Sequence, residues 1–152
     1  MKENVYTIEE VLNTQGIYVG PPVGKSMLPM LKDRADTVVI RPKKERLAPL
    51  DVALYRRGDG YLLHRVIALR EDGYLIRGDN CYYDEIVVET DVLGVLSEFY
   101  HDGKHVLCTD KKYMRYAKRR VKNYNRRRFC LRMRQGAGKF FRKIIGAFKK
   151  KD

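Results

Sequence analysis

The feature that most constrains the fold of this chain is a series of short β-type runs between residues 37 and 108. Each run is rich in β-branched, aromatic or leucine residues, and glycine-containing segments separate several of them. The segments 57–60, 71–73 and 101–103 pair aspartate with glycine, which is typical of hairpin turns. The runs cover residues 37–41, 52–56, 61–69, 74–77, 92–100 and 104–108. This spacing predicts a mainly β fold, a coiled or partly closed antiparallel sheet of sandwich or barrel-like form.

Helical patterns flank the β region on both sides. Residues 7–14 predict a short helix, because Thr7 and Glu10 form a capping-box pair and the apolar residues that follow share one face. From residue 111 onward, apolar residues recur every three or four positions among arginine and lysine. We therefore expect a β domain over residues 1–110 and a basic helical tail over residues 111–152.

Charge is distributed unevenly along the chain. The net charge is +13, and residues 111–152 hold 18 of the 32 Lys and Arg residues but only one acid, Asp152. The first 110 residues are therefore mildly acidic, and the basic character belongs to the tail.

The cysteines and the apolar runs indicate a cytoplasmic setting. The three cysteines, Cys81, Cys108 and Cys130, are odd in number and lack C-x-x-C spacing, so we expect no disulfide framework and no zinc site. No apolar run approaches the roughly 20 residues that span a bilayer, and the first five residues lack the apolar stretch of a secretory signal. We expect a cytoplasmic protein without a metal or another cofactor.

Ser26 is a candidate nucleophile because of its surroundings. It follows a glycine- and proline-rich segment and precedes Pro29, which restricts the backbone beyond it. A serine nucleophile needs an exposed hydroxyl and backbone N–H groups that can face an oxyanion. A lone serine is more often a surface, cap or turn residue, so the position alone does not decide the role.

His64 is the candidate general base. It lies in the run 61–69, where strict alternation places it on one face with Leu62 and Val66. Neutral imidazole is the usual activator of a serine hydroxyl at physiological pH. The alternative is a histidine at the edge of the core, hydrogen-bonded to backbone.

Three segments in this order resemble the signal peptidase I family and the broader clan that includes self-cleaving SOS-response repressors. The first, Gly-Lys-Ser-Met-Leu-Pro at 24–29, is similar to the nucleophile box G-x-S-M-x-P. The second runs from Leu-Asp-Val-Ala-Leu-Tyr at 50–55 to His-Arg-Val-Ile at 64–67, and is similar to the box that leads to the general base. The third, Ile-Arg-Gly-Asp-Asn at 76–80 with Asp84 following, is similar to the box K-G-D-N…D. The resemblance covers about residues 17–100.

The resemblance implies a serine endopeptidase of the branch that uses histidine as its base. His64 would take the proton of Ser26 and later protonate the leaving amine. The carboxylate that orients His64 would be Asp84 or Glu85, of which Asp84 is preferred, with Asp79 as a structural or more distant acid. The alternative for Asp79 is an aspartate that closes the turn of the Gly-Asp-Asn segment.

The resemblance further implies a substrate that binds as an extended strand, with small residues at the first and third positions before the cut. Gly24, Lys25 and Met27 are the candidate residues for the substrate and the oxyanion. Gly24 stands where many family members carry a hydroxyl residue, so the oxyanion would depend on backbone donors such as the Ser26 N–H. Leu50 stands where a glycine often precedes Asp51, and this departure concerns turn geometry.

The basic tail favours an anionic membrane surface over nucleic acid. Over residues 139–151, three phenylalanines and two isoleucines line one face among lysines and arginines. This pattern is typical of a helix in the interface of an anionic leaflet. Nucleic acid would use the charges but not the apolar face, and the third alternative is that this face packs on the β domain.

The function that we expect is cleavage of a peptide or small-protein precursor by Ser26 and His64, with the enzyme attached peripherally to the inner face of the membrane. The alternative is a catalytically silent binding module of peptidase form that the tail tethers to membrane or nucleic acid. A self-cleaving regulator is a third interpretation, but residues 1–16 are too few for a helix-turn-helix domain.

Overall fold

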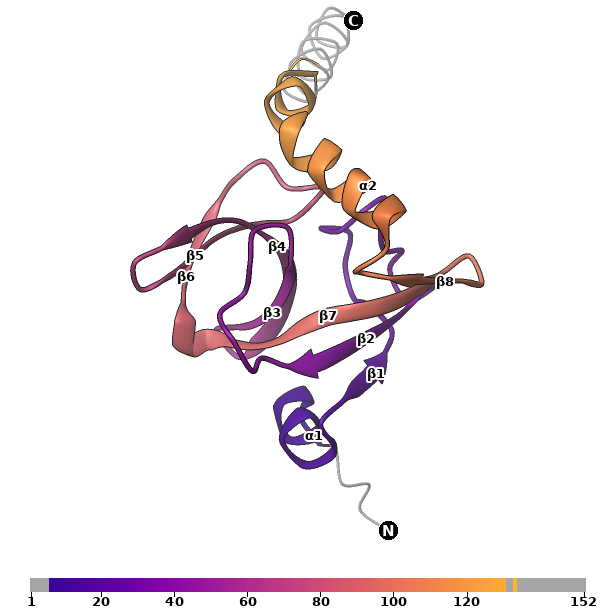
Figure 1. Ribbon diagram of the computed structural model, residues 1–152, viewed down its shortest axis with the longest axis vertical. Helices are drawn as coiled ribbons and strands as arrows, with labels where there is room; N and C mark the ends of the chain where they lie inside the picture. Colours follow the sequence, from indigo (N-terminus) through magenta and orange to yellow (C-terminus); the bar gives the residue numbers. More distant parts are fainter. Residues whose placement is uncertain (1–5, 131–132, 134–152) are drawn as a thin grey trace, which may run out of the picture. The chain divides into compact units, whose positions relative to one another are not determined.

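The fold is known from a computed structural model that describes residues 6–130 and 133. The mainly β prediction is confirmed: eight antiparallel strands form one sheet that curls into a half-barrel (Figure 1). The strand order is β1-β2-β7-β3-β4-β5-β6, and β8 pairs with β7 outside this path. The strands are β1 Tyr18–Gly20, β2 Thr37–Pro42, β3 Val52–Arg57, β4 Gly60–Arg70, β5 Gly73–Arg77, β6 Glu85–Val88, β7 Val92–His101 and β8 Lys104–Leu107.

Six of these strands lie where the sequence predicts them, and β1 and β6 were not predicted. Strand β1 has only three residues, too few for an alternating pattern. Strand β6 contains Ile-Val-Val at 86–88, a β-branched signal that the predicted runs do not include. The turn between β7 and β8 is the two-residue Asp102-Gly103 loop, and both residues have positive φ angles, as a type I′ hairpin requires.

The helices are α1 Ile8–Gln15, the 3-10 turn η1 Glu89–Asp91, and α2 Lys111–Lys122. The predicted capping box at the start of α1 is confirmed, since Glu10 N–H donates to Thr7 Oγ1 and Thr7 N–H donates to the Glu10 carboxylate. This cap fixes the entry of α1, whose Leu12 is buried.

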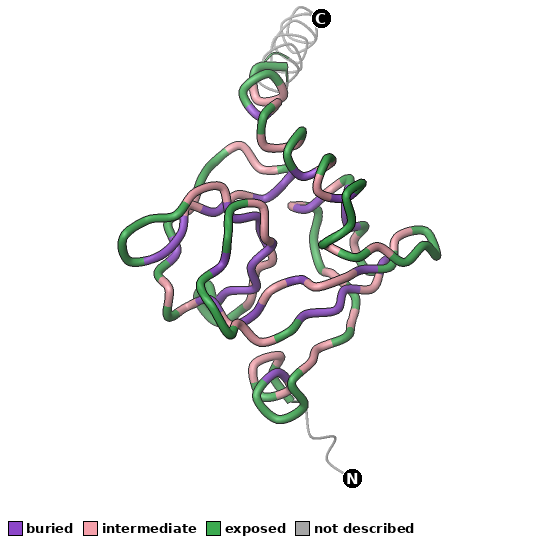
Figure 2. Tube along the Cα trace, in the orientation of Figure 1, coloured by how far each residue is buried: buried purple, intermediate pink, exposed green. Residues whose placement is uncertain are grey.

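Two hydrophobic cores lie on opposite faces of the central strands. Alternation along β3 sends Val52 and Leu54 to one face and Ala53 and Tyr55 to the other. Figure 2 shows the buried stretches along the strands and exposed residues at the β4–β5 and β7–β8 turns. The first core is the α2-side core: Leu12, Met27, Met30, Leu31, Val38, Ile40, Val52, Leu54, Leu96, Phe99 and Tyr113. The second is the Tyr55-side core: Leu47, Ala53, Tyr55, Val66, Tyr74, Ile76, Val87 and Val92.

Helix α2 packs with the β body, so the expected boundary after residue 110 is not where the chain divides. Tyr113 and Ala117 are buried, and Tyr113 belongs to the α2-side core. The chain divides into a unit of residues 1–121 and a second unit of residues 122–152. In the second unit, the described residues 124–130 are helical. The apolar face expected over residues 139–151 lies outside the described residues.

Candidate active site

The Ser26 segment lies in the turn region between β1 and β2, and two backbone contacts fix it to the Gly-Asp-Asn loop. The Asn80 N–H donates to the Ser26 carbonyl oxygen at 2.7 Å. The Asn80 side-chain amide donates to the Lys25 carbonyl oxygen at 3.1 Å. Two segments that are more than 50 residues apart in sequence are thus held together at the candidate nucleophile.

His64 lies in β4, opposite Ala53 of β3, and only 2% of its surface is exposed. It faces the Tyr55-side core, on the same side of β4 as Val66, which agrees with the predicted alternation.

Gly78 lies between the Ser26 segment and His64. A Cβ atom at this position would lie 2.9 Å from the Ser26 carbonyl oxygen, 3.0 Å from His64 Nε2 and 2.6 Å from Cys81 Sγ. The Ser26 backbone and the His64 ring therefore both pack against this glycine. Only a residue without a side chain allows this approach.

The nitrogen of His64 that an orienting carboxylate would contact is bonded to a tyrosine. His64 Nδ1 lies 2.9 Å from the Tyr55 hydroxyl, and that hydroxyl donates to Glu85 Oε2 at 2.7 Å. Glu85 is in turn paired with Arg57. Tyr55 was missed by the sequence reasoning, which treated it as an ordinary strand residue of the second box. The pairing register of β3 and β4 could have identified it, because Tyr55 is diagonal to His64 across that ladder.

The structure does not place Asp84 on His64. Within the described residues, the Asp84 carboxylate pairs with Arg77 near the surface. Asp79 is buried instead in an ion pair with Arg65, the residue that follows His64. The carboxylate nearest along the His64 hydrogen-bond chain is Glu85, which the sequence analysis gave as the alternative to Asp84, and the Tyr55 hydroxyl lies between Glu85 and His64. Consecutive residues of β4 face opposite sides, so Arg65 contacts Asp79 while His64 is linked to Glu85.

Burial is the main cause of the pKa shifts of His64 and Tyr55. Removal from water lowers the pKa of His64, and the negative charge of Glu85 acts in the opposite direction. Burial and the neighbouring Glu85 carboxylate raise the pKa of Tyr55 well above its ordinary value. Burial thus favours the neutral form of His64 and the protonated form of Tyr55.

His64 Nε2 is buried, and among the described residues it has no hydrogen-bond partner. It makes no hydrogen bond with the Ser26 hydroxyl, although both pack around Gly78. Catalytic hydrogen bonds are often long in unliganded enzymes and tighten when substrate binds. The structure thus places Ser26 and His64 around the same glycine without a hydrogen bond between their side chains.

The remaining predicted site residues surround Ser26 in different ways. Gly24 has a φ of +96° and donates its N–H to Asp33 at 2.9 Å, so that donor is already used. Lys25 is exposed. Met27 is buried, and its sulfur accepts the Asp79 N–H at 3.4 Å. The latter contact ties Met27 to the Gly-Asp-Asn loop and gives it a packing role.

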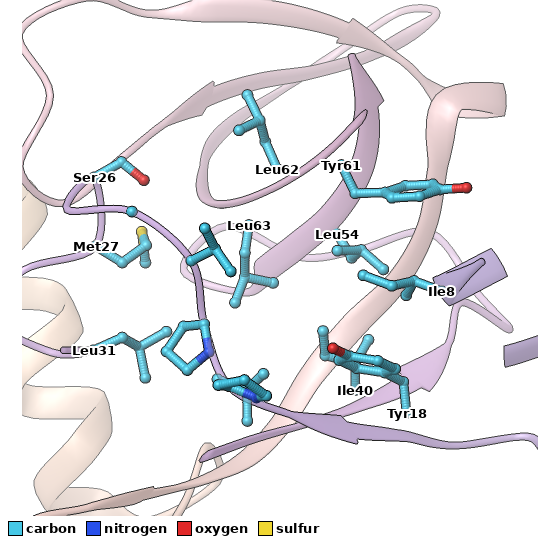
Figure 3. Close-up of a pocket in the computed structure, with 15 residues that line it drawn as sticks. Ile8, Tyr18, Ser26, Met27, Leu31, Ile40, Leu54, Tyr61, Leu62 and Leu63 are labelled. Carbon is cyan, nitrogen blue, oxygen red and sulfur yellow. The ribbon is translucent and has the colours of Figure 1, made fainter. Parts of the chain in front are cut away.

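An apolar cavity of about 270 Å³ adjoins Ser26. Figure 3 shows Ser26 at its edge, with the side chains of Leu62 and Leu63 close by and Tyr61, Leu54 and Ile8 farther along. The other lining residues that the figure labels are Tyr18, Met27, Leu31 and Ile40. The nucleophile candidate therefore borders a space that suits uncharged side chains.

Residues of helix α2 form hydrogen bonds with the loops of the site. Arg120 donates to the carbonyl oxygens of Leu28 and Asp79, each at 3.0 Å. Tyr116 donates to the Asp79 carboxylate at 3.2 Å. Sequence reasoning missed this contribution because it assigned α2 to a separate tail.

Leu50 has a φ of +86°, in the left-handed region that favours glycine. The family that the chain resembles often has glycine at this position. The Leu50 carbonyl oxygen accepts a hydrogen bond from Arg65 Nη1 at 2.9 Å. The turn therefore supplies an acceptor to the buried arginine.

In the described part of the chain, no helix is long and apolar enough to cross a membrane. Over the same residues, no group of three or more histidine, cysteine or acidic residues could hold a metal ion. A scan against models of known protein families finds no match, and a search of curated proteins finds no significant similarity.

Proposed function

We propose that the protein is a serine endopeptidase in which Ser26 is the nucleophile and His64 is the general base. The observation that carries the proposal is the packing around Gly78. The Ser26 carbonyl oxygen and His64 Nε2 both lie within 3.0 Å of the space that a Cβ there would fill. Three segments that are separate in sequence thus converge where a Ser–His pair is needed.

The reaction follows from the groups at this point. The Ser26 hydroxyl oxygen attacks a peptide carbonyl carbon while its proton passes to His64 Nε2, and the carbonyl electrons move to the oxygen. The resulting imidazolium gives the proton to the leaving amine, and an acyl-enzyme remains. Water then attacks the carbonyl carbon of the acyl-enzyme while its proton passes to His64 Nε2. The bond to the Ser26 oxygen breaks, Ser26 recovers its proton, and the acid product leaves. The backbone N–H of Ser26 forms no hydrogen bond within the described residues, and we propose it as a donor to the oxyanion.

The cavity beside Ser26 supports an uncharged substrate residue next to the cut. Its lining is almost wholly aliphatic and aromatic, and a charged side chain would lose its hydration there. We propose that the substrate is an extended peptide or a precursor protein with small or apolar residues before the scissile bond.

A fluorophosphonate probe tests the nucleophile, because the sequence contains only two serines, Ser26 and Ser97. We expect wild type and Ser97→Ala to be labelled at Ser26, and Ser26→Ala to remain unlabelled. In parallel, a library of extended peptides is incubated with the same three proteins and products are identified by mass spectrometry. Cleavage by wild type and Ser97→Ala alone supports the proposal. No labelling and no cleavage by folded wild type would favour the silent binding module.

A further inference from the structure

The hydrogen-bond chain from His64 to Glu85 contains a tyrosine, and its direction can be derived. The Tyr55 hydroxyl has one proton, and it donates that proton to Glu85 Oε2 at 2.7 Å. The contact of 2.9 Å with His64 must then have the tyrosine oxygen as acceptor and Nδ1–H as donor. A neutral imidazole carries one N–H, so Nε2 is left with its lone pair.

Strand register explains why these three residues meet. Ala53 is opposite His64, and Tyr55 lies two positions along the same face of β3. Val66 is opposite Ile76, and Ile76 is opposite Glu85. The three polar side chains therefore project from three strands onto one face of the sheet, beside the Tyr55-side core.

We propose that Tyr55 is a positioning residue that transmits the charge of Glu85 to His64 and fixes the imidazole in the tautomer that can act as a base. This inference rests on the proposed function for its catalytic consequence, but not for the tautomer itself. During attack, the Ser26 proton moves to Nε2, and the Nδ1–H stays bonded to the tyrosine oxygen. Tyr55 donates to Glu85 throughout and does not transfer its own proton.

Because Arg57 occupies one oxygen of Glu85, the direction of the hydrogen bond with Tyr55 depends on the other atom of that carboxylate. Its guanidinium pairs with Glu85 Oε1, while Oε2 accepts from Tyr55. In Glu85→Gln, the amide oxygen stays with Arg57, and the amide NH₂ takes the place of Oε2. That NH₂ donates to the tyrosine oxygen, so the Tyr55 proton turns toward His64 Nδ1. The imidazole must then carry its proton on Nε2, where it cannot accept the proton of serine.

The chain offers a matched control. Tyr74 is also buried, belongs to the same core, and donates to Glu89 Oε1 at 2.7 Å. Glu89 is paired with a cation as well, Lys43. The substitutions Tyr74→Phe and Glu89→Gln remove a comparable Tyr–Glu bond that does not involve His64, with the difference that Tyr74 and Lys43 share one oxygen of Glu89. They measure what the loss of a buried Tyr–Glu bond does to the fold alone.

The test is the tautomer of His64 in the full-length protein, from long-range ¹H–¹⁵N correlation spectra of ¹⁵N-labelled samples. The sequence has three histidines, so a His64→Gln sample assigns the resonance. At a pH where the ring is neutral, we expect Nδ1–H in wild type, Tyr74→Phe and Glu89→Gln, Nε2–H in Glu85→Gln, and a mixture in Tyr55→Phe. The same tautomer in wild type and Glu85→Gln, or Nε2–H in wild type, would overturn the inference. If Glu85→Gln does not fold, the mixture in Tyr55→Phe decides, and an unchanged Nδ1–H there refutes it.

Peptide cleavage gives the second readout. We expect Glu85→Gln to lower kcat on the order of 10²–10⁴-fold without a change in KM, because the base is disabled while the cavity is intact. Tyr55→Phe lowers kcat less, and the two control variants retain wild-type kcat. Failure of wild type to cleave any peptide would count against the proposed function and leave the tautomer result standing. Cleavage with normal kcat in Glu85→Gln would remove the catalytic role of the chain.

Discussion

Arg65 and Asp79 form a bidentate ion pair in the interior, with Nε–Oδ1 and Nη2–Oδ2 distances of 2.8 Å. Arg65 is 0% exposed and Asp79 is 4% exposed. The pair links β4 to the Gly-Asp-Asn loop one residue away from both His64 and Gly78. Tyr113 also accepts from the arginine, so helix α2 joins the same cluster. The site is therefore supported by a buried charge pair on the opposite face of the strand that carries the base.

We expect Asp79→Asn to lower the free energy of unfolding by about 3–5 kcal/mol, because it leaves the Arg65 charge buried without its counter-ion. Asp84→Asn is the control, since Asp84 is an exposed residue and its carboxylate pairs with Arg77. It should cost about 1 kcal/mol or less. Urea unfolding of the two variants and wild type measures both values. Equal losses would show that the buried pair has no special weight.

Gly78→Ala should disrupt the site directly. The added Cβ would lie 2.9 Å from a backbone oxygen of Ser26, which cannot rotate away as a flexible side chain could. We expect a loss of about 1–3 kcal/mol of stability and loss of Ser26 labelling by the fluorophosphonate probe.

Gly60→Ala is the control for this substitution, because a Cβ there meets only the Arg57 carbonyl oxygen at 4.0 Å. Labelling and stability near those of wild type are expected for it. A Gly78→Ala protein that labels normally would contradict the close approach of the three segments.

The lowered pKa of His64 predicts a pH dependence of stability. Its cause is burial, and its ordinary value is 6.5. Because the unfolded chain binds a proton more readily than the folded one, acidification favours unfolding as the pH falls through 6.5, and the effect levels off below the folded pKa.

The measurement is the difference in unfolding free energy between wild type and His64→Gln, followed from about pH 8 to about pH 5. We expect the stability of wild type relative to the variant to decrease as the pH falls. An increase would mean that the folded protein favours the imidazolium.

Removal of α2 should unfold the β body, whereas removal of the chain beyond it should not. A chain that ends at residue 110 loses Tyr113 from the α2-side core and the Arg120 bonds to the Leu28 and Asp79 carbonyl oxygens. A chain that ends at residue 122 keeps all of them. Thermal unfolding followed by circular dichroism should show a cooperative transition only for the longer chain. Cooperative unfolding of both would place the domain boundary at residue 110 after all.

Local sequence was sufficient for most of the secondary structure. Runs of alternating residues and aspartate–glycine turns predict six of the eight strands, because a strand and a tight turn depend on neighbouring residues. The capping box of Thr7 and Glu10 is of the same kind, and the structure confirms it. The three-residue β1 carries too little pattern to be predicted by this means.

The sequence by itself determined the mainly β fold, the helical character of residues 111–122, and the candidates Ser26 and His64. Only the tertiary structure decided which groups surround them. Tyr55, rather than Asp84, contacts His64 because strand register sets which side chains share a face, and register depends on pairing across the whole sheet. Helix α2 belongs to the body because Tyr113 finds Arg65 and the α2-side core there. Such contacts join residues distant in the chain, and no local pattern specifies them.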